Sequence, residues 1–141
     1  MSFKIYFAGS IRGGRDDKET YLQLIQYLSK FGQVLTEHIG HKKLNQMGEE
    51  DKTEEYIFNR DVSWIKEADL IIAEVSTPSL GVGYEIALAE SLNKEILCLY
   101  KKQVNKKLSA MINGNDYVKI LIYDNIKNIK KQLDLFFKDK S

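Results

Sequence analysis

Short apolar segments alternate along the chain with longer segments in which apolar residues recur every three or four positions. Runs rich in β-branched and aromatic residues predict strands, and apolar residues at helical spacing predict helices. We expect strands over residues 3–8, 33–36, 70–75, 95–100 and 117–122, and helices over 17–31, 53–67, 84–92, 108–112 and 125–137. The mainly apolar runs at 70–75 and 95–100, each with one glutamate, are typical of strands that are buried on both faces.

Strands that alternate with helices predict a parallel sheet covered on both sides. We therefore expect one α/β domain over residues 1–141, in which a five-stranded parallel sheet lies between helices. Such sheets bind ligands beyond the carboxyl ends of the strands, where the strand order reverses. The loops expected at that edge are 9–16, 37–52, 76–83 and 101–107, and the polar loop 37–52 has the length of a functional lid.

Composition excludes several classes of protein. The net charge of +1 argues against a binder of nucleic-acid polymers, which would carry a basic surplus. The single cysteine, Cys98, excludes an internal disulfide framework and a cysteine-based zinc site, and we expect it in the core. No apolar run approaches the roughly 20 residues that cross a bilayer, and the N-terminus lacks the layout of a signal peptide. We expect a cytoplasmic protein, or a nuclear one in a eukaryotic cell, without a membrane partner.

The loop after the first strand has the composition of an anion-binding turn. It consists of Gly9, Ser10, Ile11, Arg12, Gly13, Gly14 and Arg15, and a helix follows it. Glycines let backbone N–H groups approach an anion, Ser10 adds a hydroxyl donor, and Arg12 adds a planar fork for phosphate. The loop matches neither the dinucleotide-binding fingerprint nor a Walker A motif. A turn that merely needs glycine is the alternative, and the position at the expected switch point favours a functional role.

A second glycine-containing turn, Pro78 to Gly83, precedes Glu85. We expect Glu85 in the first turn of the next helix, where the helix dipole favours an ionised carboxylate. An ionised carboxylate at the mouth of a site is suited to attack a sugar carbon. The alternative is a glutamate that only stabilises the start of its helix, and the pattern taken alone favours this alternative.

Two other residues are candidates for the same chemistry. Asp61 stands in a helical segment although aspartate is a poor helix former, so either a salt bridge to a neighbouring basic residue or a role in a site explains it. Tyr6 lies near the carboxyl end of the first strand, as a core aromatic or as a catalytic hydroxyl. His38 and His41 have no cysteine nearby, so we expect a solvated or substrate-edge role rather than a metal site.

Several segments stand in order along nearly the whole chain: YFAGSIRGGR at 6–15, LTEH at 35–38, AD at 68–69, AEV at 73–75, PSLGVGYE at 78–85 and LSAM at 108–111. Together they resemble the 2'-deoxynucleoside 5'-phosphate N-hydrolases, which belong to the nucleoside 2-deoxyribosyltransferase superfamily. The resemblance implies a flavodoxin-like (Rossmann-like) three-layer fold and hydrolysis of the N-glycosidic bond of a deoxynucleoside 5'-monophosphate. The products would be the free base and 2-deoxyribose 5-phosphate. The resemblance also implies a homodimer, with no metal and no cofactor.

The same resemblance implies roles for individual residues. Glu85 matches the nucleophile, Asp61 a second essential carboxylate and Tyr6 an active-site tyrosine. The implied substrate-binding residues are Gly9, Ser10, Ile11, Arg12, Gly13, Gly14, Arg15, Ser79, Gly81, Ser109, Ala110 and Met111. Segment 109–111 would reach into the neighbouring subunit's site. The chain departs from the family pattern at 39–58 and 101–107, which leaves the base preference open.

Other functions stay open beside the hydrolase. A nucleoside 2-deoxyribosyltransferase would share Glu85 but take substrates without phosphate. The phosphate donors Arg12, Ser10 and Ser79 would then be left unpaired. A ribonucleotide hydrolase that acts on a pyrimidine 5'-monophosphate is a close alternative, because no residue for the 2' contact is identifiable. A non-catalytic nucleotide-binding module would tolerate the loss of the candidate carboxylates and tyrosine, which are all present.

Overall fold

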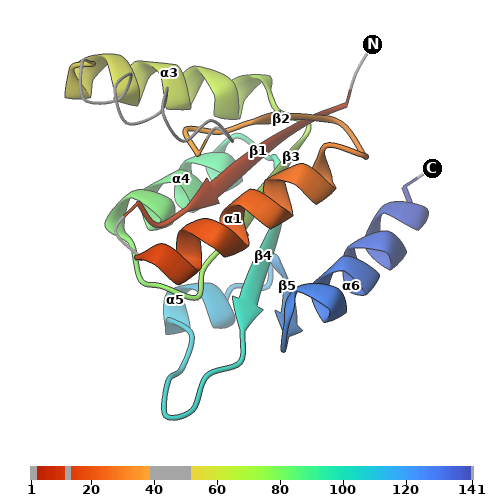
Figure 1. The fold of residues 1–141 in the computed structure, drawn as a ribbon. Coiled ribbons are helices and arrows are strands. Elements are labelled where there is room, and N and C mark those ends of the chain that lie inside the picture. Colours follow the sequence, from red (N-terminus) through yellow and green to blue (C-terminus); the bar gives the residue numbers. More distant parts are fainter. Residues whose placement is uncertain (1–2, 12–13, 39–51, 141) are drawn as a thin grey trace.

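A five-stranded parallel sheet forms the centre of the fold in the computed structural model, which describes residues 3–11, 14–38 and 52–140 (Figure 1). The strands are β1 (Lys4–Gly9), β2 (Gln33–Leu35), β3 (Leu70–Glu74), β4 (Glu95–Lys101) and β5 (Lys119–Tyr123). Their order in the sheet is β2-β1-β3-β4-β5, which is the flavodoxin-like order. The predicted fold class is therefore confirmed. The strand order reverses between β1 and β3, so the site is expected where these two strands end.

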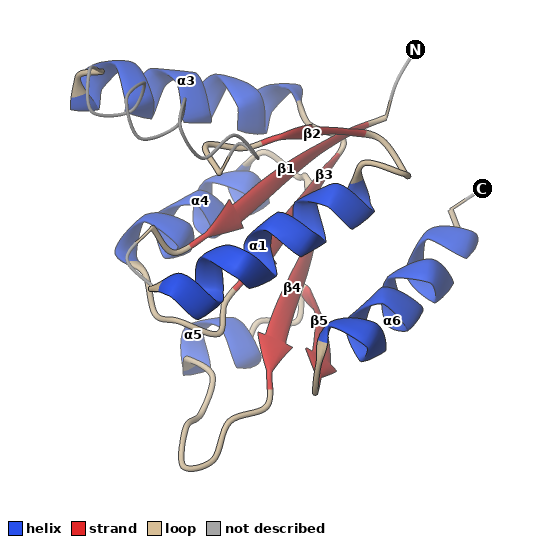
Figure 2. Ribbon diagram, in the orientation of Figure 1, coloured by secondary structure: helices blue, strands red, loops and turns tan. Residues whose placement is uncertain are grey.

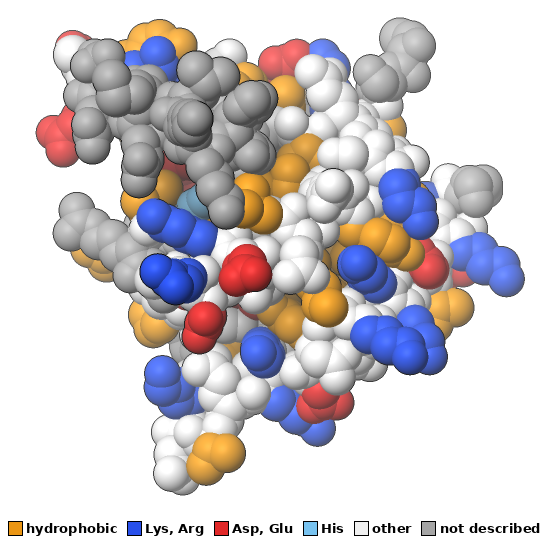
Figure 3. Space-filling model, in the orientation of Figure 1, with side chains coloured by type: hydrophobic (Ala, Val, Ile, Leu, Met, Phe, Trp, Pro, Cys, Tyr) orange, Lys and Arg blue, Asp and Glu red, His pale blue; other side chains and the backbone are white. Residues whose placement is uncertain are grey.

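Helices cover both faces of the sheet (Figure 2). They are α1 (Arg15–Leu28), α3 (Glu54–Glu67), α4 (Leu80–Ser91), α5 (Ala110–Asn113) and α6 (Ile126–Lys138). Helices α1 and α6 pack on one face, and α3, α4 and α5 pack on the other. No helix among the described residues is both long and apolar enough to cross a membrane. Lysines lie on the outer side of α6, in the lower right of Figure 3.

Side chains of β1 alternate between the two layers of the core, as they must in a strand. Ile5 and Phe7 pack with α1 and α6, whereas Tyr6 packs with α3 and α4. The Tyr6 side chain therefore lies on the side of the sheet that carries α3 and α4. Cys98, on the same side, is fully buried as predicted.

The bounds of the helices differ from the expected ones by one or two residues, and by more in α1 and α4. Helix α1 spans 15–28 rather than 17–31, and α4 begins at Leu80 rather than at residue 84. The early start of α4 has a local cause, because the Ser79 hydroxyl accepts a hydrogen bond from the backbone N–H of Val82 at 3.2 Å and caps the helix. Val82 is also buried in the core, so packing overrides the weak helix propensity of the neighbouring glycines.

The loop from β3 to α4 is fixed by a buried carboxylate. Glu74, 2% exposed at the end of β3, accepts hydrogen bonds from Ser76 N at 2.9 Å, Ser76 Oγ at 2.6 Å and Tyr123 Oη at 2.5 Å. Thr77 Oγ1 donates to Asp17 Oδ2 at 2.5 Å and ties the same loop to α1. Burial raises the pKa of Glu74, and these donors counteract the rise. The segment that leads into Ser79 is thereby held against the sheet and against α1.

Candidate active site

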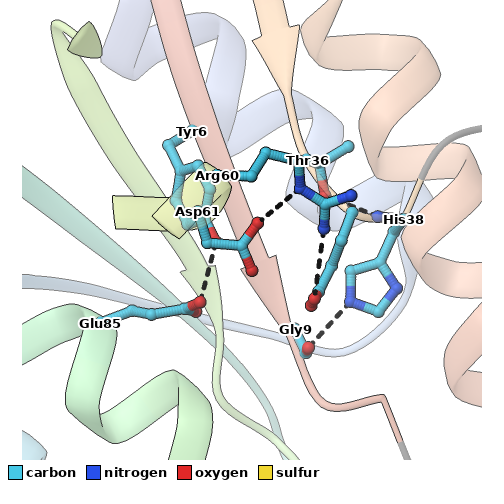
Figure 4. Close-up of polar contacts among 8 residues, drawn as sticks. Tyr6, Gly9, Thr36, His38, Arg60, Asp61 and Glu85 are labelled. Atoms are coloured by element: carbon cyan, nitrogen blue, oxygen red, sulfur yellow. Dashed lines mark hydrogen bonds and ion pairs between the residues drawn. The ribbon is translucent and has the colours of Figure 1, made fainter. Parts of the chain in front are cut away.

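A tyrosine and a glutamate meet between the sheet and α4 (Figure 4). The Tyr6 hydroxyl donates a hydrogen bond to Glu85 Oε2 at 2.8 Å. Tyr6 is 1% exposed, and burial followed by the charges of Glu85 and Asp61 raises the pKa of its hydroxyl. The hydroxyl therefore keeps its proton and remains a donor, which holds the Glu85 carboxylate in one orientation.

Glu85 lies in the second turn of α4, not in the first turn as expected. The helix dipole acts mainly within the first turn, so it does not explain how this side chain ionises. The pKa of Glu85 is raised to about 7 in total. Burial makes the largest contribution, the charge of Asp61 adds to it, and the Tyr6 hydrogen bond opposes both. The side chain thus ionises near neutral pH, and the tyrosine, rather than the helix end, favours its charged form.

Asp61 lies on α3 and is 7% exposed. Arg60 Nε donates to Asp61 Oδ1 at 3.0 Å. The charge of Asp61 also acts on both Tyr6 and Glu85. The salt bridge predicted for a helical aspartate is therefore present, and the same side chain lies close to Tyr6 and Glu85.

Glu37 is a site residue that the sequence analysis missed. Its side chain is 16% exposed, it hydrogen-bonds with Asp61, and its Oε1 lies 3.9 Å from Arg60 Nη2. Burial, together with the charges of Asp61 and Glu85, raises the pKa of Glu37 to about 8, whereas Arg60 lowers it. The available signal was its position after β2, whose carboxyl end lies at the edge of the sheet where ligands bind. A carboxyl group that keeps its proton at neutral pH can donate it to a leaving group.

His38 joins the loop after β2 to the end of β1. Its Nε2 lies 2.8 Å from the carbonyl oxygen of Gly9, and its ring packs edge-on against Tyr21 with 4.9 Å between centroids. The backbone N–H of His38 donates to Thr36 Oγ1 at 3.0 Å. Within the described residues, no group of three His, Cys, Asp or Glu side chains is placed to hold a metal ion. His41 lies outside the described residues.

The start of the first predicted phosphate loop packs against Tyr21. A Cβ atom on Gly9 would come within 2.8 Å of the Tyr21 ring, so packing alone requires glycine there. The backbone N–H of Ser10 donates to the Tyr21 hydroxyl at 3.0 Å, and Ser10 is 5% exposed. The path of the chain out of β1 is therefore fixed by an aromatic side chain of α1.

The loop then turns at Gly14 before it enters α1. Ile11 is 56% exposed, and Arg15 begins α1. Gly14 has a φ of 91°, a value that side-chain-bearing residues rarely adopt, so this turn requires glycine. Arg12 and Gly13 lie outside the described residues.

Ser79 and Ser109 occupy equivalent positions as helix caps. The Ser79 oxygen caps α4, and the Ser109 oxygen accepts from the backbone N–H of Met111 at 3.2 Å to cap α5. Each hydroxyl retains its own proton as a donor. A Cβ atom on Gly81 would meet nothing closer than Ser79 Oγ at 3.9 Å, so packing within this chain does not require glycine there.

Both serines line a pocket of about 540 Å³ between α4 and α5. Its walls are mainly apolar, and Leu80 and Met111 at its rim are 97% and 84% exposed. Glu85 is not among the residues that line this pocket. The structure thus unites Tyr6, Asp61 and Glu85 as predicted, and it places 109–111 elsewhere.

The chain is thus an α/β protein with a flavodoxin-like sheet, and the Glu85 carboxylate, held by Tyr6, lies near the point where the strand order reverses. Residues 5–122 match the model of the nucleoside 2-deoxyribosyltransferase family, and the chain belongs to this family. The resemblance inferred from the sequence segments is therefore confirmed.

Within this family the chain is similar to a group of hydrolases. It is 47% identical over 114 residues to the 5-hydroxymethyl-dUMP N-hydrolase of Tetraodon nigroviridis, with 80% of each chain covered. It is 42% identical over 136 residues to the protein of that name from Rattus norvegicus, covering 94% of this chain and 83% of the rat protein.

Solved structures show the same fold at lower identity. The CMP N-glycosidase of Clostridium botulinum aligns with a TM-score of 0.68 and 24% identity, covering 93% of this chain and 98% of that one. A 2-deoxyribosyltransferase from Bacillus psychrosaccharolyticus aligns with a TM-score of 0.66 and 16% identity, covering 90% of each chain. At these identities the likeness concerns the fold.

The raised pKa of Glu37 predicts a pH-dependent effect on stability. Because the pKa rises from 4.5 to about 8 on folding, the contribution of Glu37 to stability is fully present below pH 4.5 and is lost as the pH rises through 8. Glu37→Gln carries no proton to lose at this position, so the variant does not lose this stability as the pH rises. Its unfolding free energy relative to wild type is expected to be about 2 kcal/mol higher at pH 9 than at pH 4, a value discounted for the partial exposure of Glu37 to solvent.

Urea denaturation of both proteins at the two pH values measures this difference. Glu19→Gln, at an exposed position of α1, is the matched control and is expected to show no such trend. An equal effect of Glu37→Gln at both pH values would contradict the assignment of a raised pKa to Glu37.

Proposed function

We propose that this chain hydrolyses the N-glycosidic bond of 2'-deoxynucleoside 5'-monophosphates to the free base and 2-deoxyribose 5-phosphate. The observation that carries the proposal is the Glu85 carboxylate, held at 2.8 Å by a tyrosine and flanked by the Glu37–Asp61 pair. The names of the relatives, which are N-hydrolases, support a hydrolase over a transferase.

The geometry supports a two-step reaction with a covalent intermediate. Glu85 attacks the anomeric carbon C1' as the bond from C1' to the base breaks, and the departing base takes that electron pair. Water then attacks C1', and the Glu85 carboxylate leaves. Two displacements at one carbon give net retention of configuration. Water is the only co-substrate that this sequence of steps needs.

The departing base needs a proton, and the structure offers Glu37 as its source. Glu37 keeps its proton to about pH 8 and hydrogen-bonds to Asp61, which Arg60 holds at 3.0 Å. In the first step Glu37 donates the proton to the base. In the second step the same carboxylate removes a proton from the attacking water, which restores the starting state. Asp61 orients Glu37 throughout.

The 5'-phosphate supplies binding energy remote from the reacting carbon. The loop from Gly9 to Arg15 and the Ser79 hydroxyl are the groups proposed to bind it, with Arg12 as a bidentate donor. We expect the monophosphate to be hydrolysed far faster than the matching nucleoside. Arg12→Ala is expected to cost about 2–3 kcal/mol in kcat/KM, because a buried phosphate would lose a charged partner.

Base release from a deoxynucleoside and from its monophosphate, at equal concentration, measures this preference. Lys18→Ala, an exposed cation on α1, is the control for a loss of charge alone. Equal rates with the two substrates would favour the transferase alternative.

The base preference follows from the relatives. Because they are named for 5-hydroxymethyl-dUMP, we propose a modified pyrimidine deoxynucleotide as the preferred substrate. The decisive assay incubates the protein with this nucleotide, with each standard deoxynucleotide and with each ribonucleotide monophosphate, and measures released base by chromatography. Release from ribonucleotides alone would indicate the ribonucleotide hydrolase, and base exchange without net release would indicate a transferase.

The proposal includes a homodimer in which segment 109–111 contributes to the partner's site. Met111 in this segment and Leu80 on α4, which line the same pocket, are apolar and 84% and 97% exposed. Tyr84, four residues after Leu80 on α4, and Phe58 on α3 are 54% and 51% exposed and lie 6.0 Å apart between ring centroids. Exposed apolar side chains of this kind favour an interface. A second copy of the chain is the proposed occupant.

A mixing experiment tests whether sites are shared. Ser109→Ala is expected to weaken nucleotide binding by about 1–2 kcal/mol, through the loss of a hydroxyl donor. When Ser109→Ala and Glu85→Gln subunits exchange, a mixed dimer contains one site with both lesions and one with neither. Activity above the sum of the two parents is therefore expected. No gain despite demonstrated exchange, or a fully active monomer in sedimentation, would contradict the shared site.

A further inference from the structure

Arg60 is packed against the carboxyl groups of the site from within α3. Its Nε lies 3.0 Å from Asp61 Oδ1, and its Nη2 lies 3.9 Å from Glu37 Oε1. The side chain is 10% exposed, and its guanidinium lies over the ring of Trp64, 4.7 Å from the centroid. The proposed mechanism has Arg60 hold Asp61, but it does not say which carboxyl group Arg60 leaves protonated.

We propose that Arg60 is a positioning residue that keeps Asp61 ionised and leaves the proton of the Glu37–Asp61 pair on Glu37. This inference rests on the proposed function, because it assigns the proton donor for the departing base.

The distances from Arg60 to Asp61 and to Glu37 indicate which of the two carboxyl groups keeps the proton. At 3.0 Å the contact with Asp61 is a charge-assisted hydrogen bond, which stabilises an ionised acceptor. The contact with Glu37, at 3.9 Å, lies beyond hydrogen-bonding distance and acts by charge alone. Since the two carboxyl groups share a hydrogen bond, one of them must donate. The group farther from the guanidinium is the one left with the proton.

The surrounding charges oppose ionisation of both members of the pair. The Glu85 carboxylate of α4 and the protonated Tyr6 hydroxyl of β1 face the carboxyl groups of this pair. His38, next in the chain to Glu37, bonds to Gly9. A third negative charge beside Glu85 and Asp61 would be repelled by both, and Arg60 balances one charge only. The site therefore retains one proton, and Arg60 decides where it resides.

Arginine is better suited to this task than lysine. Arg60 and Trp64 are four residues apart on one helix, so they lie on the same helical face. The guanidinium lies over the indole ring while its Nε donates to Asp61, and a lysine ammonium has no planar group with which to make both contacts. The contact with Trp64 holds the guanidinium, and the guanidinium in turn holds the Asp61 carboxylate.

The test measures the titration of Glu37 directly. Carboxyl carbons labelled with ¹³C report ionisation by NMR, and Glu37→Gln assigns the Glu37 signal. In wild type, Glu37 is expected to titrate near pH 8. In Arg60→Met, which keeps an apolar side chain over Trp64, the midpoint should rise by about one pH unit or more. Arg60→Lys restores the charge and should bring the midpoint back towards wild type. Lys66→Met, at an exposed position of the same helix, is the control.

Kinetics supply a second readout that a merely structural role would not move. The alkaline fall of kcat/KM should shift upward in Arg60→Met by the same amount as the NMR midpoint, and Arg60→Lys should reverse it. A purely structural role would lower activity at every pH without moving this limb. An unmoved Glu37 midpoint in Arg60→Met, or an equal shift in Lys66→Met, overturns the proposal.

The two readouts separate this inference from the proposed function. The NMR titration needs no turnover. If the Glu37 midpoint shifts in Arg60→Met but the wild-type protein releases no base, the hydrolase is refuted and the role of Arg60 in placing the proton stands. Hydrolysis by wild type with an unmoved midpoint would refute the role of Arg60 alone.

Discussion

Glu85→Gln is expected to abolish base release while leaving nucleotide binding nearly unchanged. The amide has the shape of the carboxylate, and its oxygen can still accept the Tyr6 hydrogen bond, but it does not form an ester with C1'. We expect kcat to fall by more than about a thousandfold, or about 4 kcal/mol in activation free energy. Base release measures turnover, and calorimetry with a deoxynucleoside monophosphate measures binding.

The matched control is Glu19→Gln, which makes the same chemical change at an exposed position of α1 and should leave both quantities intact. Turnover of Glu85→Gln within about tenfold of wild type would remove Glu85 from the nucleophile role, because a loss below about 1.4 kcal/mol is too small for a missing covalent step.

Glu37→Gln is expected to lower kcat/KM by about a hundredfold to ten-thousandfold, the usual range for a lost general acid. In wild type the rate should rise with pH as Glu85 loses its proton near pH 7, and fall as Glu37 loses its proton near pH 8. The variant lacks the second group, so the alkaline fall should disappear. The pH dependence of kcat/KM measures both effects.

The leaving group supplies a further check on Glu37. A base that carries an electron-withdrawing substituent departs more readily as an anion and needs less protonation. The defect of Glu37→Gln should therefore shrink with such a substrate. A defect that stays constant across leaving groups, or an alkaline fall that persists in Glu37→Gln, would contradict the assignment of Glu37 as the acid.

The sheet could be predicted because its signals are local. The mainly apolar runs at 70–75 and 95–100 correspond to the buried strands β3 and β4, and short apolar segments alternate with helical ones throughout. The start of α4 was misplaced because glycines at 81 and 83 indicate a loop by propensity. The Ser79 cap and the burial of Val82 outweigh that propensity, and only the packed structure shows the burial.

The site could be predicted in part, for a different reason. The resemblance identified Glu85, Asp61 and Tyr6 as a set, although the helix-dipole argument for Glu85 was wrong. Glu37 was missed because it lies in a polar segment after a three-residue strand, far in sequence from Asp61. What unites the two is the packing of α3 beside the end of β2, a tertiary relation that no local pattern encodes.

The stereochemistry of transfer to solvent tests the central claim, that Glu85 forms a covalent intermediate, most directly. In water that contains methanol, part of the deoxyribosyl group should be transferred to methanol in place of water. Proton NMR of the methyl 2-deoxyriboside 5-phosphate reports its anomeric configuration. Because two displacements retain configuration, we expect the β anomer from a β-nucleotide. The α anomer would show a single displacement by solvent and would contradict a Glu85 nucleophile.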